Sequence, residues 1–284
     1  MYIGLFAYLI LAPVAGCLLA GVDRKITAHM QGRVGPPILQ PYYDVRKLLA
    51  KDKRSVNGLQ TVYIALYLLF VAFAGAIFFA GGNFLLSVFV LTLSSLFLVV
   101  AGYSARSPYA DAGAEREMIQ VMSYEPMVLL VAIGFYLVHH TFNVGALARG
   151  SSSLVFQLPL VFVGFIYVLT IKLRKSPFDL STSHHAHQEL VKGVTTEMSG
   201  RTLACVEIAH WYESIMFLGW VALFVLTGSW ISVVVAVIVC LVIYFLEILI
   251  DNNFARVKWQ VMLSSAWALA LALGFVNLLI VYIR

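Results

Sequence analysis

Long apolar runs with few or no charged residues, separated by polar segments, dominate the chain. The first covers residues 2–22, about the 20 residues that an α-helix needs to cross a bilayer. Similar runs predict seven more spanning helices near residues 59–80, 84–105, 118–140, 154–171, 203–227, 230–250 and 259–282. The run 214–246 is too long for one untilted helix, so we divide it at Gly228 and expect another tight turn at Gly81. The pattern predicts an all-α polytopic membrane protein with about eight transmembrane helices.

Composition indicates that a bilayer, rather than water, is the solvent of this chain. Hydrophobic residues make up 61% of the sequence and the mean hydropathy is +0.90. Charged residues make up only 12%, about half the share of a soluble domain. The first apolar run lacks the basic start and the small-residue cleavage site of a signal peptide, so we expect it to remain in place as the first helix.

The sequence carries no signature of a soluble enzyme. Cys17, Cys205 and Cys240 lie far apart within predicted spans, so this chain alone cannot assemble a four-thiolate iron–sulfur site. The sequence contains no Walker loop and no GxGxxG, GxSxG or HExxH motif. It also lacks the internal repeat that marks many secondary transporters. We expect no catalytic residue and no cofactor in this chain.

The distribution of cations predicts the orientation in the membrane. Of the 19 Lys and Arg residues, 17 fall in the first, third, fifth and seventh connections, and only Arg149 and Arg284 fall on the other face. By the positive-inside rule, these odd-numbered connections are cytoplasmic and both termini lie outside. We expect one membrane domain, residues 1–284, with long cytoplasmic loops at residues 23–58 and 172–203. The asymmetry accounts for the net charge of +5, and no basic stripe with interleaved aromatic residues predicts a nucleic-acid partner.

The first long loop combines a rigid turn with a short amphipathic helix. After a charged start at Asp23, the chain turns within the stretch "GRVGPP" at residues 32–37. Leu48 and Leu49 then oppose three cations on a helix that we expect to lie along the membrane surface. Binding of this basic helix to anionic lipid head groups is a sound alternative to a specific role, but it leaves the rigid turn unexplained.

One carboxylate is predicted inside a spanning helix. The segment "SPYADAGAEREMIQVMSYEP" brings acidic residues to the membrane surface and places Glu125 about two turns inside the span. Pro126 removes a backbone donor beside it and frees a carbonyl near residue 122. An intramembrane carboxylate is costly and is by default a candidate functional site. We expect Glu125 to hold a proton or an ion; a static ion pair with Arg116 or another loop cation is the alternative.

Further ionisable residues follow in the second long loop and the next span. They are Glu189 and Glu197 in the loop, and Glu207, His210 and Glu213 at positions i, i+3 and i+6 of the predicted helix. The last three spread over roughly 120° of one side of the helix. Closely set carboxylates in a low dielectric cannot all ionise, so some would share protons, as a proton relay requires. Structural pairing with Lys192 and Arg201 is the competing interpretation.

The stretch "HHAH" in the same loop raises the question of a metal ion. Imidazole is the commonest metal ligand, and Glu189 and His210 could add to a site. Three histidines within four residues cannot all face one ion on a regular helix, and no second cluster has ligand spacing. We therefore expect no metal, and interpret His184, His185 and His187 as protonatable or interface-forming groups. A haem on His139 or His140 is a weaker alternative.

Several short motifs occur in an order that identifies a family. They are "GRVGPP", "QPYYDVRKLL", "SYEPM", "KSPFDL", "QELVKG", "TEMSG" and "ARVKWQVM". With them the chain resembles the membrane subunit that joins the peripheral arm to the membrane arm in respiratory complex I, called the H subunit in bacteria and subunit 1 in mitochondria. The resemblance covers nearly the whole chain. Residues 181–188 replace a shorter acidic segment by a histidine-rich one, and here the chain is more similar to the counterparts in energy-converting, group 4 membrane-bound NiFe hydrogenases, including formate hydrogenlyase.

The resemblance implies a non-catalytic coupling subunit of an energy-converting oxidoreductase in the prokaryotic plasma membrane. It would link electron transfer in the peripheral arm to proton or Na⁺ translocation, with iron–sulfur clusters and a NiFe centre in partner subunits. The implied partners are an iron–sulfur small subunit, a hydrogenase-like large subunit and antiporter-like membrane subunits. Proton or ion coupling would involve Glu125, Glu189, Glu197, Glu207, His210 and Glu213. Docking of the peripheral arm would involve Arg33, Asp44, Asp179, His184, His185, His187 and Arg201.

Two alternatives remain open at this point. The first is a quinone-reducing complex of the same family, in which the first long loop would frame the quinone entry. The departure at residues 181–188 argues against a complete quinone site. The second is an independent proton or Na⁺ secondary transporter, which would carry its own site at the membrane midplane and work without partner subunits.

Overall fold

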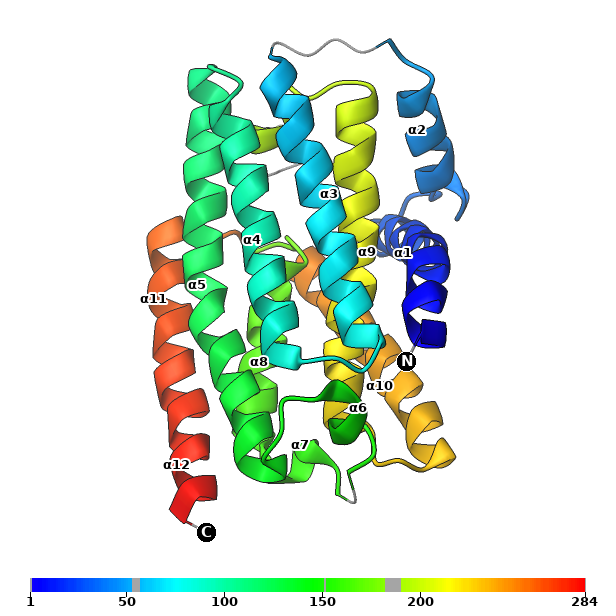
Figure 1. Ribbon diagram of the computed structural model, residues 1–284. Helices are drawn as coiled ribbons and strands as arrows, with labels where there is room; N and C mark the ends of the chain where they lie inside the picture. Colours follow the sequence, from blue (N-terminus) through cyan, green and yellow to red (C-terminus); the bar gives the residue numbers. More distant parts are fainter. Residues whose placement is uncertain (1, 53–56, 151, 182–189, 284) are drawn as a thin grey trace.

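The computed structural model describes residues 2–52, 57–150, 152–181 and 190–283, and these residues form helices joined by connections of different lengths (Figure 1). The described part contains no β-sheet, only an isolated bridge between Asn83 and Asn143. In chain order the elements are α1 (Tyr2–Met30), α2 (Gln40–Leu49), α3 (Gly58–Phe79), α4 (Phe84–Tyr103), α5 (Pro108–His139), α6 (Val144–Leu147), α7 (Leu154–Gln157), α8 (Pro159–Lys172), the 3₁₀ turn η1 (Gly193–Thr195), α9 (Arg201–Val225), α10 (Trp230–Asn253), α11 (Trp259–Leu269), the π-helical η2 (Ala270–Phe275) and α12 (Val276–Ile283). The predicted all-α fold is confirmed.

Seven of the described helices are long and apolar enough to cross a membrane, and they match seven of the eight predicted spans. They are α1, α3, α4, α5, α9, α10 and the continuous rod α11–η2–α12. The exception is the span expected at residues 154–171, where the chain forms α7 and the 14-residue α8. Pro159 explains the break, because its ring removes a backbone donor and keeps Leu158 (ψ 50) out of the helical region.

Two predicted boundaries were wrong because charged residues were interpreted as the start of a loop. α1 continues beyond Val22 to Met30, and α5 begins at Pro108 instead of residue 118. The helical extension of α1 persists because Asp23 faces a polar cavity instead of hydrocarbon. Pro108 suits the first turn of α5, where a missing N–H group leaves no intrahelical hydrogen bond unmade.

The predicted turns are confirmed. Gly81 (φ +77) and Gly228 (φ +67) adopt the left-handed backbone conformation that glycine allows. The helices that follow are capped by side chains: Asn83 accepts a hydrogen bond from the Leu86 N–H at 3.1 Å. The uncharged run 214–246 is accordingly divided between α9 and α10 around Gly228.

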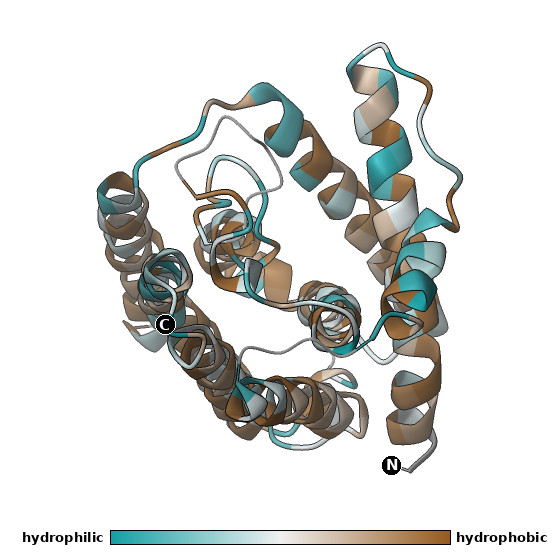
Figure 2. Ribbon diagram, turned by 90° about the horizontal axis from the view of Figure 1, so that it is seen from above, coloured by the Kyte–Doolittle hydropathy of each residue, from teal (hydrophilic) through white to brown (hydrophobic). Residues whose placement is uncertain are grey.

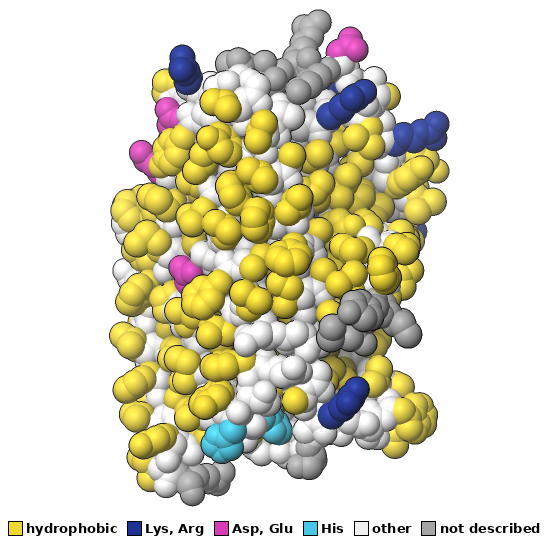
Figure 3. All heavy atoms as spheres, viewed as in Figure 1, with side chains coloured by type: hydrophobic (Ala, Val, Ile, Leu, Met, Phe, Trp, Pro, Cys, Tyr) yellow, Lys and Arg dark blue, Asp and Glu magenta, His cyan; other side chains and the backbone are white. Residues whose placement is uncertain are grey.

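The helices enclose an apolar core and also present an apolar outer surface. α3, α4, α5 and α9 run side by side along the length of the molecule (Figure 1). The largest side chains buried between helices are Tyr67, Phe84, Phe135, Phe165, Phe217, Trp220 and Phe224. On the outside, hydrophobic side chains cover the middle of the molecule, and most of the visible Lys and Arg side chains gather near the upper end (Figure 3). We call this the cation-rich end; α3, α5 and α9 begin there.

α1 leans across the rest of the bundle, as the view along the bundle shows (Figure 2). Small residues permit this close approach. A Cβ added at Gly16 would lie 2.6 Å from the carbonyl oxygen of Trp211 on α9, and one added at Gly75 of α3 would clash with the ring of Tyr8. The Tyr8 hydroxyl group also donates a hydrogen bond to the carbonyl of Tyr212 at 3.0 Å. α1 is thereby fixed against both α3 and α9.

The amphipathic helix expected in the first long loop is present as α2. Val45 and Leu48 on one face pack against residues of α1 and α9. Tyr42, Tyr43 and Leu49 on the other face remain exposed. α2 therefore attaches to the bundle through one side only.

Pro126 affects α5 as the sequence predicted. The helix continues through the proline, and the carbonyl of Met122, four positions earlier, lacks its usual partner within the helix. The Trp267 indole N–H on α11 donates a hydrogen bond to this carbonyl at 3.1 Å. The proline next to Glu125 is thus accommodated by a neighbouring helix.

The described part of the second long loop folds into the cation-rich end instead of extending away from it. Asp179 accepts hydrogen bonds from Arg256 Nε at 3.0 Å and Nη2 at 3.1 Å, and the Val257 N–H donates to the Pro177 carbonyl at 3.2 Å. Farther along, Val194 and Met198 are buried among the helices. This segment closes one end of the bundle and carries side chains into it.

The orientation predicted from the 17 to 2 division of cations can be tested by cysteine labelling. In a background without native cysteines, we expect Lys192→Cys to react with a membrane-impermeant maleimide only from the cytoplasm, and Arg149→Cys only from outside. Both side chains are exposed. Labelling of Lys192→Cys from the outer face would contradict the orientation.

Candidate functional site

A buried guanidinium joins α5 and α9 inside the bundle, about halfway along α9. Arg174 follows α8, and its left-handed backbone (φ 52), unusual for a residue with a side chain, ends the helix. The side chain turns into the bundle, where Nη2 lies 2.8 Å from Glu117 Oε1 on α5 and Nη1 lies 3.4 Å from Glu213 Oε2 on α9. All three side chains are at least 87% buried, with exposed fractions of 13%, 5% and 7%. Three elements distant in sequence therefore meet in one ion-paired group.

The electrostatics of this group keep Arg174 charged. Burial opposes the positive charge, but the adjacent Glu117 carboxylate, followed by Tyr67 and Glu213, raises the pKa of Arg174 well above its ordinary value. A buried guanidinium that cannot lose its proton depends on its carboxylate partners. The shorter contact makes Glu117 the principal partner and leaves Glu213 the more loosely held one.

Glu117 is held by a polar network of its own. Ser181 Oγ hydrogen-bonds to Glu117 Oε2 and lies 2.7 Å from Gln120 Oε1, while Gln120 Nε2 donates to the carbonyl of Phe178. A hydroxyl group has one hydrogen, so Ser181 donates to one of its two oxygen neighbours at a time. A proton on Glu117 would let the carboxyl group donate to Ser181 and Ser181 donate to Gln120. The network can therefore accept one further proton without losing a hydrogen bond.

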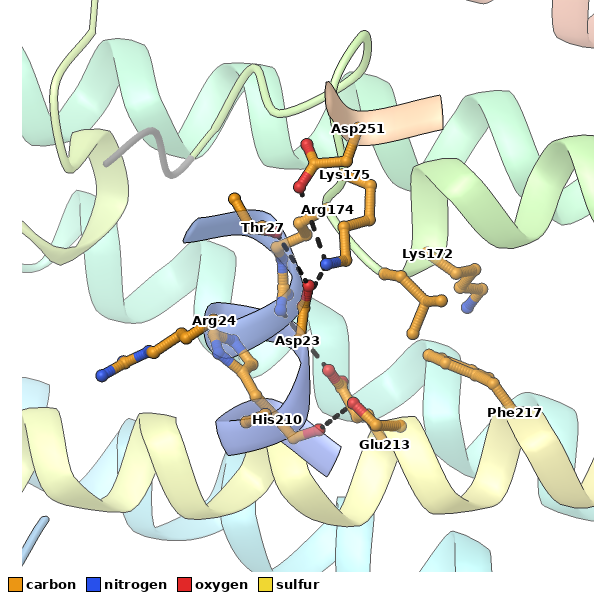
Figure 4. Close-up of a pocket in the computed structure, with 13 residues that line it drawn as sticks. Asp23, Arg24, Thr27, Lys172, Arg174, Lys175, His210, Glu213, Phe217 and Asp251 are labelled. Atoms are coloured by element: carbon orange, nitrogen blue, oxygen red, sulfur yellow. Dashed lines mark hydrogen bonds and ion pairs between the residues drawn. The ribbon is translucent and has the colours of Figure 1, made fainter. Parts of the chain in front are cut away.

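A cavity of about 530 Å³ opens beside the Arg174–Glu213 pair (Figure 4). Its lining comes from α1, the end of α8, the residues after α8, α9 and α10. Seven of the thirteen lining residues are Asp, Glu, Lys or Arg: Asp23, Arg24, Lys172, Arg174, Lys175, Glu213 and Asp251. His210, Ser214 and Phe217 of α9 line it as well. Binding pockets for drug-sized molecules are mostly apolar, so this cavity is better suited to water and protons.

A second ion-paired group lies at the side of the cavity. Lys175 pairs with Asp23 of α1, and its ammonium group lies 3.6 Å from Asp251 Oδ2 of α10 (Figure 4). The Ser176 N–H donates to Asp251 Oδ1 at 2.8 Å. These contacts join the leaning α1 to α10 through the segment after α8. A change in the position of that segment would therefore alter its contacts with both helices.

The structure brings two of the six predicted coupling residues to this cavity, His210 and Glu213. Glu125 is half-buried on α5 and does not line the cavity. Glu197 and Glu207 are also half-buried and lie outside its lining. Glu189 lies outside the described residues. The idea that Glu207 and Glu213 share one site finds no support in these contacts, because only Glu213 faces the charged cavity.

The predicted docking residues have varied surroundings. Arg33 and Arg201 are exposed. Asp44 forms a surface ion pair with Arg24 at 2.7 Å, and Asp179 is buried against Arg256 as described above. The histidines at 184, 185 and 187 lie outside the described residues. Within the described ranges, no group of three or more His, Cys, Asp and Glu residues is placed to hold a metal ion.

Sequence reasoning missed four residues that the structure makes prominent. They are Glu117, Lys172, Arg174 and Glu247. Lys172 and Arg174 stand at the end of a span, where cations were interpreted only as a sign of orientation. Glu247 is fully buried within α10, and neither carboxyl oxygen has a hydrogen-bond partner among the described residues. A charge within a predicted span was the available signal for Glu247, as it was for Glu125.

Comparison with known proteins places this arrangement in a family. The family model described as NADH dehydrogenase matches residues 3–282. The H subunit of NADH-quinone oxidoreductase from Geobacillus kaustophilus is 26% identical over 99% of this chain and 92% of its own length. Hydrogenase-4 component C of Escherichia coli is 30% identical over 88% of this chain and 86% of its own length.

The fold has a counterpart among solved structures. A chain in the membrane-bound sulfane sulfur reductase, an archaeal respiratory membrane complex, superposes with a TM-score of 0.87 over 99% of both chains at 21% identity. Such a likeness concerns the fold, whereas the family match covers nearly the whole sequence. The chain therefore belongs to the NADH dehydrogenase family of bacterial H subunits and mitochondrial subunit 1, and is a multi-pass membrane subunit of a complex I-like respiratory oxidoreductase.

Proposed function

We propose that this chain is the coupling subunit of an energy-converting NiFe hydrogenase complex. It would anchor the peripheral arm to the membrane and link electron transfer there to proton or Na⁺ translocation. The observation that carries the proposal is the buried Glu117–Arg174–Glu213 group beside a charged cavity within the bundle. Ionisable groups in a membrane interior are costly and characteristic of ion or proton paths.

The hydrogenase assignment rests on the family relationship together with the second long loop. Hydrogenase-4 component C is 30% identical to this chain. Iron–sulfur clusters and nickel would belong to the partner subunits, an iron–sulfur small subunit and a hydrogenase-like large subunit. Antiporter-like membrane subunits would receive the coupled ion. The chain would itself supply titratable groups and mechanical connections.

Within this proposal the ionisable residues form a track with Glu213 and His210 at its start. Both line the charged cavity. Glu125 would extend the track toward the membrane interior. Glu189, Glu197 and Glu207 would supply further protonatable groups near the peripheral arm. The docking surface would comprise Arg33, Asp44, Asp179, His184, His185, His187 and Arg201.

A quinone-reducing complex is the second candidate, favoured by the relatives that are H subunits of NADH-quinone oxidoreductases. The cavity volume of about 530 Å³ is within the range of small-molecule sites. Its charged lining argues for a polar occupant, and we place the quinone-reducing complex second for that reason.

Purification distinguishes the coupling subunit from an independent transporter. A chain purified under mild detergent conditions from its native membrane should bring iron–sulfur and nickel-containing subunits with it, measured by mass spectrometry and metal analysis. Iron without nickel, together with bound quinone, would favour the second candidate. Ion transport by the isolated chain in liposomes would instead identify a transporter and contradict the coupling role.

Neutralising Glu117 and neutralising Glu213 should have different effects on the complex. Glu213→Gln removes the more loosely held partner of Arg174, so we expect assembly and electron transfer between soluble dyes to persist while ion-coupled turnover falls. Glu117→Gln breaks the closer buried ion pair, which costs about 3–5 kcal/mol, so we expect a lower melting temperature and less assembled complex.

Glu115→Gln is the matched control for both variants. Glu115 lies on the same helix as Glu117, two positions earlier, but its side chain is exposed. We expect this variant to keep stability and coupling within error. Full ion-coupled turnover in Glu213→Gln would contradict the role proposed for Glu213.

The Asp179–Arg256 pair allows a test of docking. Asp179→Ala should release peripheral subunits during purification, because truncating one partner of a desolvated charge pair costs about 2–5 kcal/mol and leaves Arg256 without this carboxylate. If Asp179 acts by holding the segment at residues 177–181 in place, Arg256→Met should release the peripheral subunits to the same extent as Asp179→Ala. Subunit composition measured by native mass spectrometry checks both variants. Retention of the peripheral subunits in Asp179→Ala, with a selective loss of coupling, would contradict the docking role.

A further inference from the structure

Lys172 is buried at the charged site without an ion-pair partner among the described residues. It is the last residue of α8 and only 8% exposed. Its ammonium nitrogen lies 3.4 Å from the centre of the Tyr124 ring and 5.2 Å from that of Phe217. Within the described part of the chain, Lys172 forms no hydrogen bond and no ion pair. The two cations that follow, Arg174 and Lys175, are both paired with carboxylates.

An aromatic face is a weak substitute for a carboxylate. A cation–π contact stabilises an ammonium ion by less than its removal from water destabilises it. The charged form of Lys172 is therefore held less firmly than that of Lys175, and a lysine can release its proton where an arginine cannot. The tyrosine ring can accommodate the neutral amine as well as the cation.

The groups around Lys172 come from every element packed at the site. Those that act on it electrostatically are Glu117 and Glu125 of α5, Glu213 of α9 and Arg174. The remaining charged or titratable groups of the shared cavity are Asp23 and Arg24 of α1, Lys175, His210 of α9 and Asp251 of α10. Tyr124 lies beneath the ammonium group. Of the three glutamates that act on Lys172, Glu213 is the one that lines the same large cavity, and its contact with Arg174 is long, at 3.4 Å.

We propose that Lys172 and Glu213 form a proton-exchanging pair. The N–H bond of the Lys172 ammonium group breaks and an O–H bond forms on the Glu213 carboxylate, leaving a neutral amine and a neutral acid; the reverse step restores both charges. Both side chains line the cavity of about 530 Å³ and a small neighbouring one, so water can bridge them. This inference rests on the proposed coupling function. It adds Lys172, a cation that forms no ion pair with any carboxylate of the described residues, to the groups that carry protons.

The protonation of Lys172 can be measured without any enzymatic activity. The purified complex is pulsed with acetic anhydride at a series of pH values, and acetylation of each lysine is quantified by mass spectrometry, since only the neutral amine reacts. We expect the midpoint for Lys172 to lie about 1 pH unit or more below that of exposed Lys192. Glu213→Gln removes a nearby negative charge and should lower the Lys172 midpoint further.

Two results of the labelling would overturn the proposal. One is a Lys172 midpoint equal to or above that of Lys192. The other is that Lys172 is not acetylated at any pH at which Lys175 is acetylated. Both side chains line the same cavity, so a reagent that reaches Lys175 should also reach Lys172. A midpoint for Lys172 that does not change in Glu213→Gln would remove Glu213 as its partner.

Substitution separates a proton-exchanging role from a structural one. Lys172→Arg keeps a cation near Tyr124 but cannot release a proton, whereas Lys172→Met keeps much of the side-chain volume without charge. If Lys172 exchanges protons, both variants should lower ion-coupled turnover at least tenfold while the complex remains assembled. Normal coupling in Lys172→Arg would show that only its charge matters and would overturn the proposal.

These outcomes can be told apart from failure of the proposed function. A Lys172 midpoint equal to that of Lys192, together with uncoupling in Glu213→Gln, would support the coupling function and exclude Lys172 from it. A lowered Lys172 midpoint in a chain that purifies without redox partners would instead remove the coupling function and leave the titration as a property of the isolated site.

Discussion

The packing of the chain around the end of α8 depends on burying one arginine. Arg174 keeps its charge in the bundle, so two carboxylates from different helices must face it, Glu117 from α5 and Glu213 from α9. To place Arg174 between these carboxylates, the chain after α8 turns into the bundle. Ser181 of the same segment then forms a hydrogen bond with Glu117. A segment that would otherwise be a surface loop becomes the wall of a charged cavity.

The long helices could be predicted because the bilayer imposes a length and a composition on each of them. The prediction failed where polar protein surroundings replaced lipid. α1 continues past Val22 because Asp23 meets Lys175, and α5 begins at Pro108 because its first turns lie in the polar cation-rich end. The break before Pro159 was readable in the sequence, but a run of apolar residues concealed it.

The candidate site was predictable only in part, because its members converge in space and not in sequence. Glu213 and His210 stood out as ionisable residues in an apolar helix. Glu207 stood out equally, yet six positions place it roughly 120° away from Glu213 around α9, outside the cavity. Arg174 and Lys172 have no such signal, since a cation at the end of a span is expected in any membrane protein.

Under the proposed function, the unequal partners of Arg174 would provide a physical route between the peripheral face and the membrane interior. Glu117 is tied to the segment at residues 178–181 through Ser181 and Gln120, whereas Glu213 contributes one longer contact. A force on that segment from a docked partner would move Arg174 with Glu117 and weaken its contact with Glu213. The Glu213 carboxylate would then lose a stabilising charge and bind a proton more readily. By reciprocity, protonation of Glu213 would bias the position of the segment, so redox events outside and proton binding inside would influence each other through one guanidinium.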